Sequence, residues 1–454
     1  MKSPQATASK SVTPTGFRNA RYLILFVATF LVFLYSPVAQ VLDSRFSLLL
    51  TESLLTYRTP DLKNYWIKDI DPAHMPSELD TRHLPSAYQL VSLNDKILYY
   101  YPHGSSFLSL PFVAGMRAFG WSVVDSYGAY SPRRETQEQL ILAPFLMAIA
   151  ACFFLRSAEL VLPTSWSIVV ALGATFGTQI WSTASRGLWS HTWEVLLTGI
   201  LVVELLKVET GGKPPKPIWL ASLLSWIFFV RPTGAVIVIG VTGYVFLTHR
   251  RQFKMYISVG AAWLIAFVAY SKSTFGRFLP PYYHRGFYLS RASLVRLAGD
   301  LVSPSRGLLV FVPITALIIF MTIHYWRQLR YRSLAILAIS IIVAHLVVLS
   351  GDPIWYGGWC YGPRLSTDLV PWFCLLAILS LDVVRRYSDT APGHNPLIVC
   401  ACMLLLLGLT MNAIGALSLE TMAWNAGPNL DARVWDWERP QFLAWIIEPR
   451  PQIP

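Results

Sequence analysis

The stretch SPVAQVLDSRFSLLLTESLL, residues 36–55, places an acidic side chain, Asp43, directly after the first long apolar run of the chain. That run, Tyr22–Val41, has the roughly 20 residues that an α-helix needs to cross the hydrocarbon core of a membrane. An ionised side chain at the water edge of such a helix is costly to keep, so Asp43 is a candidate functional group. The next clear apolar run begins at Leu140, which leaves residues 42–139 as an unusually long first external loop.

The composition of the whole chain agrees with a membrane location. Of its 454 residues, 54% are hydrophobic and 14% are charged, whereas roughly 25% are charged in soluble proteins. Trp (17), Tyr (21) and Phe (24) are abundant, as is typical of rings at membrane interfaces. Apolar windows along the chain predict about eleven transmembrane helices and therefore an all-α polytopic membrane protein. No small-residue cleavage site follows the first apolar run, so we expect an uncleaved span.

Basic residues predict the orientation. The net charge of +12 comes with Lys and Arg clusters before the first span and between later ones, so nucleic-acid binding is a poor interpretation of it. The clusters share one side of the membrane if residues 218–248 cross twice; one long broken helix is the alternative. We therefore expect an inner-membrane protein with a disordered cytoplasmic N-terminus (1–21), a transmembrane domain (22–419) that includes the loop 42–139, and an external C-terminal tail (420–454).

The external loops carry further signals. TESLLTYRTPDL (51–62) predicts an amphipathic helix lying in the membrane interface. YQLVSLNDKILYYYP (88–102) alternates and turns at its Asn-Asp pair, which predicts a small β-hairpin. A later loop, 271–306, carries six basic residues against Asp300 alone. Either the orientation is wrong there, or these cations bind an anionic lipid phosphate.

Asp43 has two compatible interpretations. A carboxylate at the interface can deprotonate a hydroxyl acceptor held within hydrogen-bond reach. Asp is also a good N-cap, and the residue can begin the helix that follows it. Further along the loop, Asp69 and Asp71 form a D-x-D whose carboxylates can share a divalent cation, although a solvated pair is the commoner outcome.

Two short segments hold isolated ionisable groups. YYYPHG (99–104) contains Tyr101 and His103, where the imidazole is a base, a phosphate partner or an incidental member of an aromatic belt. FFVRPTG (228–234) contains Arg231 between two apolar windows. We expect that arginine to snorkel to the outer interface.

The segment GTQIWSTASRGLWSHTWE (177–194) gathers Arg186, His191 and Glu194 within nine residues. A cation, an imidazole and a carboxylate near lipid are costly unless they pair with one another or bind something. Both interpretations are open at this point.

The segment GDPIWYGGWCYGPRLSTDLVP (351–371) is the strongest local signal after Asp43. Its glycines permit close backbone approach to sugar or phosphate oxygens, and Arg364 is a forked donor for a phosphate. Arg306, in SPSRGLL (303–309), stands at another helix start, where an anion is favoured. An ordinary interfacial turn is the alternative in both places. Four aromatic side chains of the first segment offer flat faces for sugar rings: Trp355, Tyr356, Trp359 and Tyr361.

The order of these pieces resembles bacterial membrane glycosyltransferases of the C type (GT-C), which are related to protein O-mannosyltransferases. The resemblance rests on VLDSRFSLLLTESLL, YYYPHGSSFLSLPF, GTQIWSTASRGLWSH, RPTG, SPSRGLL, YGGWCYGPRLSTDLVP and the tail VWDWERPQF. It covers most of the chain from Asp43 onward. It implies a GT-C-like fold and an inverting transfer at the outer face, from a polyprenyl-phosphate-linked sugar to an acceptor hydroxyl of a glycan, lipid or protein.

By that resemblance Asp43 is the general base, and later residues hold the substrates. The residues implied to bind the donor phosphate are Arg306, Arg364, Arg186 and Arg285. The residues implied to bind the sugar or the acceptor are His103, Tyr101, Trp355, Tyr356, Trp359, Tyr361, His191 and Glu194. Many relatives carry an acidic pair in the first loop, whereas Asp43 is followed by Ser44-Arg45. A divalent cation as cofactor is therefore left open, with Asp69 and Asp71 as its candidate ligands.

Two other functions fit a membrane protein of this kind. A transporter or flippase of a lipid-linked glycan predicts matching broken helices in two halves, and we find no such repeat. A glycan ligase or polymerase would also use external arginines, but it would not need Asp43.

Overall fold

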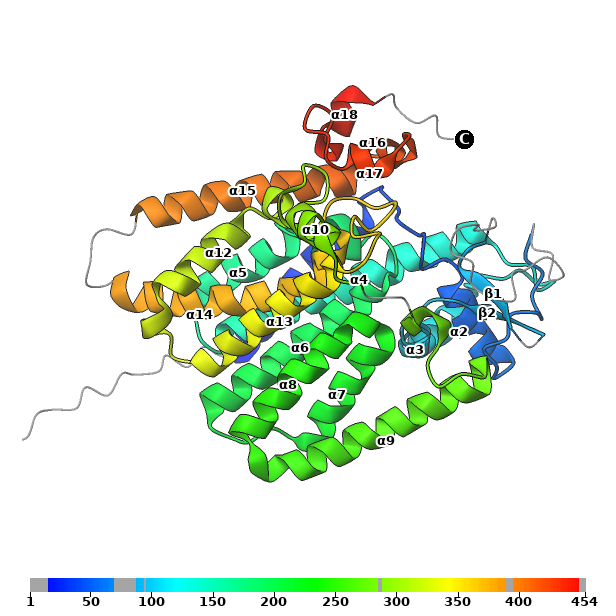
Figure 1. Cartoon of the computed structure of the whole chain (residues 1–454), viewed down its shortest axis with the longest axis horizontal. Coiled ribbons are helices and arrows are strands. Elements are labelled where there is room, and N and C mark those ends of the chain that lie inside the picture. Colours follow the sequence, from blue (N-terminus) through cyan, green and yellow to red (C-terminus); the bar gives the residue numbers. More distant parts are fainter. Residues whose placement is uncertain (1–14, 69–86, 94, 285–287, 389–394, 449–454) are drawn as a thin grey trace, which may run out of the picture.

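The computed structural model is a bundle of α-helices with smaller elements at one end (Figure 1). It describes residues 15–68, 87–93, 95–284, 288–388 and 395–448. The predicted D-x-D (Asp69 and Asp71) and Arg285 lie outside the described residues. Helix α1, Thr15–Leu34, begins inside the segment expected to be disordered.

Among the described residues, five stretches are helical, long and apolar enough to cross a membrane: Pro132–Glu159, Arg250–Phe275, Arg332–Ser350, Arg364–Arg386 and Pro396–Leu417. They correspond to α4, α9, α13, the 3-10 helix η6 (Arg364–Leu369) together with α14 (Val370–Ser388), and α15. Other apolar helices are shorter, among them α5 (Thr164–Phe176) and α12 (Ile314–His324). The helices support a multi-pass membrane protein, while the predicted number of about eleven spans is not confirmed.

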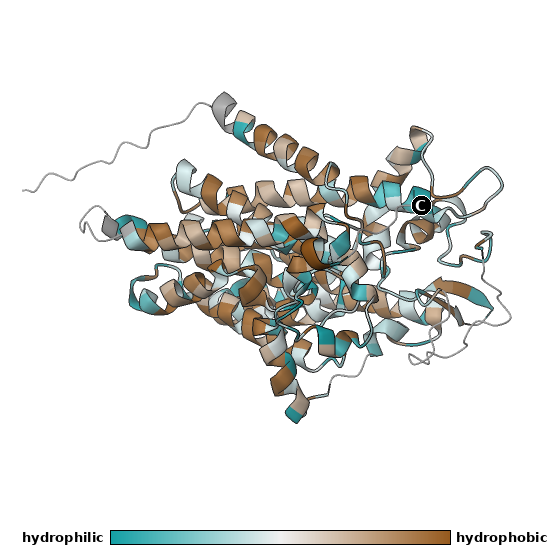
Figure 2. Cartoon of the chain, turned by 90° about the horizontal axis from the view of Figure 1, so that it is seen from above, coloured by the Kyte–Doolittle hydropathy of each residue, from teal (hydrophilic) through white to brown (hydrophobic). Residues whose placement is uncertain are grey.

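The helices differ in how deeply they lie in the bundle. Helix α4 packs against α1, α5 and α6 (Ser190–Gly211), and α14 (Val370–Ser388) contacts helices on several sides. The apolar window of η6 and α14 is 89% buried, whereas that of α9 or α15 is 11% buried. Hydrophobic residues run along most of the long helices in Figure 2, and hydrophilic ones gather toward their ends. The outer helices therefore present apolar surface to a lipid environment.

Residues 218–248 form a helical hairpin. Helix α7, Pro217–Val230, and α8, Ala235–Thr248, are separated by a short 3-10 turn, Pro232–Gly234, and pack against each other. The chain breaks here because Pro232 cannot donate a hydrogen bond to the preceding turn. This favours the hairpin over one long broken helix, and it places Arg231 at the tip between the two helices.

The first loop folds against one end of the bundle (Figure 1). Helix α2, Ser47–Thr56, starts before the predicted interfacial helix, and its first seven residues are buried. It packs on α3, Gly104–Ala118, and ends at Thr56, so it overlaps only the first half of the predicted segment 51–62, and its position in the membrane interface stays a prediction. The predicted β-hairpin is confirmed: β1 (Leu90–Leu93) and β2 (Lys96–Tyr99) are antiparallel.

The N-terminus of α2 shows that Asp43 is not a helix cap. The N-cap residue is Phe46, and the carboxylate of Glu135 in α4 accepts hydrogen bonds from the backbone N–H of Phe46 (2.8 Å) and Leu48 (2.9 Å). A carboxylate from another helix thus satisfies the free N–H groups that an N-cap side chain would otherwise take. Asp43 is left free to point elsewhere.

The C-terminal tail is folded. Short helices α16 (Glu420–Ala423), α17 (Leu430–Arg433) and α18 (Ala444–Ile447) form a cap in which Trp424 and Val434 are fully buried. It packs beside α10, Arg291–Val302 (Figure 1).

Candidate active site

A cavity of about 620 Å³ lies where the first loop meets the later turns. Its size is in the range of small-molecule binding pockets. Segments far apart in the chain contribute to its wall, namely residues within 42–47, 88–105, 188–191, 231–233, 282–283 and 348–365.

Asp43 and Arg364 meet in this wall. The Nη1 of Arg364 donates to Oδ2 of Asp43 at 2.8 Å, although the two residues stand 321 positions apart. The hydroxyls of Tyr101 and Tyr88 donate to Oδ1 at 2.9 and 3.1 Å. The Asp43 side chain is 25% exposed, so the carboxylate is held by three donors and is still open to the cavity.

The partners of Asp43 determine its ionisation. Burial alone raises the pKa of Asp43, but the Arg364 charge and the hydrogen bonds from Arg364, Tyr101 and Tyr88 outweigh it, and the net pKa lies below its ordinary value. Burial and the nearby carboxylate raise the pKa of both tyrosines, which therefore stay neutral donors. Asp43 is a carboxylate at neutral pH, and it gains basicity only if Arg364 loosens its hold.

Most of the hydrogen-bond donors of Arg364 are unused by the described residues. Its guanidinium stacks 4.1 Å from the ring centroid of Trp189. Among the described residues its side chain donates one hydrogen bond, to Asp43, and its buried Nε has no partner. A buried donor without a partner is rare in proteins and calls for an explanation such as a ligand.

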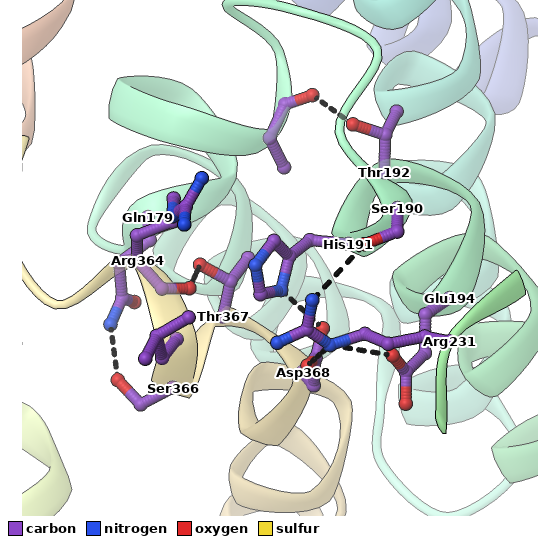
Figure 3. A network of polar contacts seen from close by, with 12 residues as sticks. Gln179, Ser190, His191, Thr192, Glu194, Arg231, Arg364, Ser366, Thr367 and Asp368 are labelled. Carbon is purple, nitrogen blue, oxygen red and sulfur yellow. Dashed lines mark hydrogen bonds and ion pairs between the residues drawn. The ribbon is translucent and has the colours of Figure 1, made fainter. Parts of the chain in front are cut away.

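A second charged cluster, formed by Arg231, Asp368, Glu194 and His191, lies near Arg364 (Figure 3). The Nε of Arg231 lies 2.8 Å from Asp368 Oδ2 and 3.4 Å from Glu194 Oε2. Its Nη1 donates to the hydroxyl of Ser190 at 3.0 Å. The Nδ1 of His191 lies 2.8 Å from Asp368 Oδ1. The pairing alternative for the 177–194 segment therefore holds for His191 and Glu194, with Asp368 and Arg231 as the partners in place of Arg186.

The expectation that Arg231 snorkels is wrong. Its residue is only 6% exposed, and it lines the cavity. Two buried carboxylates hold the guanidinium in place, which removes the reason for it to reach toward water. Arg231 and Asp368 were missed as site residues because each lies at the edge of an apolar window. The signal available in the sequence was the cost of leaving either charge unpaired there.

Five of the predicted site residues line the cavity: Asp43, Tyr101, His191, Trp359 and Arg364. Trp359 is 51% exposed and presents an aromatic face. The adjacent Gly357 and Gly358 have φ angles of 75° and 67°, a backbone conformation that favours glycine. Glu194 lies behind the wall, against Arg231.

Arg186 is not brought to the cavity. It is fully buried, its Nη1 donates to the carbonyl of Ser36 at 2.6 Å, and its Nη2 donates to the carbonyl of Phe33. These carbonyls stand at the C-terminal end of α1, where backbone oxygens lack helical partners. Arg186 therefore caps the end of α1 instead of reaching the cavity for the predicted phosphate contact.

Arg306 also turns away from the cavity. Its Nε donates to the carbonyl of Tyr356 at 2.8 Å, its Nη2 donates to Asn425 at 2.8 Å, and its Nη1 donates to Gln441. Further bonds go to the carbonyls of Ser305 and Gly358. With its donors on neutral protein oxygens, Arg306 anchors the C-terminal tail and has no capacity left for a phosphate.

The remaining predicted residues have packing positions. Both ring nitrogens of His103 are engaged, with Tyr270 (2.6 Å) and the carbonyl of Tyr99 (2.8 Å), and burial lowers its pKa to about 4. His103 is therefore a neutral member of the aromatic belt. The other three do not line the cavity: Trp355 packs on Trp435, Tyr356 accepts from Arg306, and Tyr361 donates to the carbonyl of Met411.

The described residues contain no group of three or more His, Cys, Asp or Glu side chains suited to a metal ion. Asp69 and Asp71 lie outside those residues. The divalent cation stays a prediction.

No protein-family model matches the chain. A search of curated protein sequences found no significant match. Among solved structures, the chain is similar to ArnT from Cupriavidus metallidurans in the apo state, with 12% sequence identity and a TM-score of 0.49 over 94% of this chain and 74% of that one. Neither value is high enough to carry an argument about fold or activity.

Proposed function

We propose that this protein is a membrane glycosyltransferase that moves a sugar from a polyprenyl-phosphate-linked donor to an acceptor hydroxyl, with inversion, at the outer face of the membrane. Asp43 is the general base, and Arg364 holds the donor phosphate. The observation that carries the proposal is the 2.8 Å contact between these two side chains in the wall of the cavity.

The reaction forms one bond and breaks one. The acceptor oxygen attacks the anomeric carbon, and its proton passes to the Asp43 carboxylate. The bond between the anomeric carbon and the phosphate oxygen breaks, and the polyprenyl phosphate leaves with the bonding electrons. The products are the glycosylated acceptor, a protonated Asp43 and a phosphate monoester with one more negative charge than the donor had.

This charge shift explains why the base and an arginine share one ion pair. In the substrate-free protein, Arg364 neutralises the Asp43 carboxylate. As Asp43 takes the proton, it loses its charge, and Arg364 becomes available to the phosphate that is gaining one. The arginine exchanges partners within the step, so its stabilisation is greatest as the leaving group departs, where electrostatic help lowers the barrier most.

The rest of the cavity suits a sugar. Trp359 offers an exposed ring face, and the hydroxyls of Tyr88 and Tyr101 both donate to the Asp43 carboxylate. Helix α13 contributes Val348 and Leu349 to the wall of the cavity and is apolar along its length, which suits the lipid tail of the donor.

The test is glycan analysis by mass spectrometry in a deletion strain complemented with variants. Wild type restores the missing glycan, and Asp43→Asn does not, because an amide cannot accept the proton. Asp125→Asn is the matched control from the same loop: its carboxylate accepts bonds from Tyr127 and Ala129 and does not line the cavity. Full restoration of the glycan by Asp43→Asn at equal protein levels would rule out Asp43 as the general base and favour the transporter or the ligase.

A further inference from the structure

We infer that Arg231 is a second anion-binding group of the cavity and that it holds the donor phosphate together with Arg364. This rests on the proposed function, because it concerns the same phosphate. It assigns a cavity role to a residue that stands at the hairpin tip between α7 and α8.

The contacts of Arg231 use only part of its guanidinium. The Nε faces the buried carboxylates of Asp368 and Glu194, and the Nη1 donates to Ser190. In the part of the chain that the structure describes, Nη2 has no hydrogen-bond partner, and the residue lines the cavity. Figure 3 shows the guanidinium fixed from the carboxylate side. An arginine fixed in this way is pre-organised to donate from Nη2.

Arg306 is the internal comparison. It is equally buried, but Nε, Nη1 and Nη2 all donate to protein oxygens. Arg306 therefore has no donor left for a ligand. Arg231 is not saturated, and neither is Arg364, whose Nε is buried without a partner. The two unsaturated arginines line the same cavity, where their charges repel each other.

The two arginines differ in how their charge is balanced during the reaction. Arg364 is paired with Asp43, which becomes neutral when it accepts a proton. Arg231 is paired with Asp368, which does not line the cavity and exchanges no proton with the acceptor. Arg231 therefore supplies a constant positive field, while the contribution of Arg364 grows during the step. Together they match a phosphate whose charge rises as the sugar leaves.

The experiment compares the binding of polyprenyl phosphate and of polyprenol to the purified full-length protein in lipid nanodiscs. Wild type should prefer the phosphate, and Arg231→Gln should reduce that preference about tenfold or more, the worth of a charge-assisted hydrogen bond. Arg231→Lys keeps the charge that balances Asp368 but loses the fork, so it should fold and show a several-fold smaller preference.

The decisive variant is Arg231→Gln combined with Asp368→Asn, which removes both charges of the buried pair. If Arg231 served only to neutralise Asp368, this double variant would regain the wild-type preference, and so would Arg231→Lys; either result overturns the inference. Continued loss in the folded double variant supports it. A wild-type protein with no preference for phosphate over alcohol overturns the donor assignment itself, whereas a preference that is insensitive to Arg231 but lost in Arg364→Lys overturns only the role of Arg231.

Discussion

Arg364 and Arg306 look alike in sequence and differ in the fold. Each follows a turn at the start of an apolar helix, and each side chain is buried. Arg364 donates one hydrogen bond, to a carboxylate at the edge of a cavity, and keeps a buried Nε without a partner. Arg306 donates from every nitrogen to neutral oxygens of the C-terminal tail and the adjoining turns. What separates a binding arginine from an anchoring one is the number of its donors that the protein leaves unused.

Among variants of the arginines and of the partners of Asp43, the largest effect should come from Arg364→Lys. Lysine keeps the charge but loses the fork that spans Asp43 and the phosphate. We expect turnover to fall about 100-fold or more, as for the loss of one pre-organised donor to a developing oxyanion. The measurement is the initial rate of sugar transfer in membranes, normalised to folded protein. A rate within threefold of wild type would place Arg364 in the same class as Arg306.

Arg306→Lys should separate stability from chemistry. The change removes bonds to Gln441 and Asn425 and should destabilise the protein by about 1–3 kcal/mol, because buried acceptors lose a charged donor. Thermal unfolding of the purified protein should shift to lower temperature, while the transfer rate per folded molecule stays near that of wild type. A reduced rate without a thermal shift would contradict the anchoring role.

The pH dependence of Arg364→Gln tests the electrostatics of Asp43. Burial raises the pKa of Asp43, and Arg364 is the first influence that lowers it. Without Arg364 the pKa rises, so the carboxylate is lost to protonation at a higher pH. The acid limb of kcat/KM, which reports the free enzyme, should therefore move upward in pH relative to wild type. An unmoved acid limb would mean that Asp43 is not the titrating base.

The smallest effect should come from Tyr101→Phe. It removes one of the two tyrosine hydroxyls that donate to Asp43 and leaves Arg364 in place. Loss of one hydrogen bond from a neutral donor corresponds to about a tenfold change in the ionisation equilibrium, the low end of the range for hydrogen bonds to charged groups. The acid limb should shift in the same direction as for Arg364→Gln, but by less. A larger shift than in the arginine variant would reverse the ranking of the two partners.

Local patterns in the sequence were enough for some elements. The β-hairpin follows from alternation and an Asn-Asp turn, and the break before Pro232 follows from the missing N–H of proline. The helix after Asp43 begins earlier than predicted because the Glu135 carboxylate of α4 holds the N-terminus of α2, a contact between distant segments. Its burial against α3 is equally invisible in a window of ten residues.

The site was predicted only in part, because its side chains also come from distant segments of the chain. Arg364 stood out as a forked donor in a glycine-rich segment and Asp43 as a costly charge at a membrane edge, and the fold brings them together. Arg186 gave the same signal, but packing turns it onto the end of α1. Arg231 was expected to reach toward water, but the fold pairs it with Asp368, a residue from a distant segment. Sequence identifies which charges need a partner, and only the tertiary structure decides whether that partner is the protein or a ligand.

The most direct test of the account is a double-mutant cycle on the transfer rate with Asp43→Asn, Arg364→Lys and the combined variant. If Arg364 exchanges the Asp43 carboxylate for the donor phosphate within a single step, both substitutions disable that step. The double variant should then be no slower than the slower single variant. Rate losses that multiply across the two sites would show that Asp43 and Arg364 act independently and would contradict the shared pair.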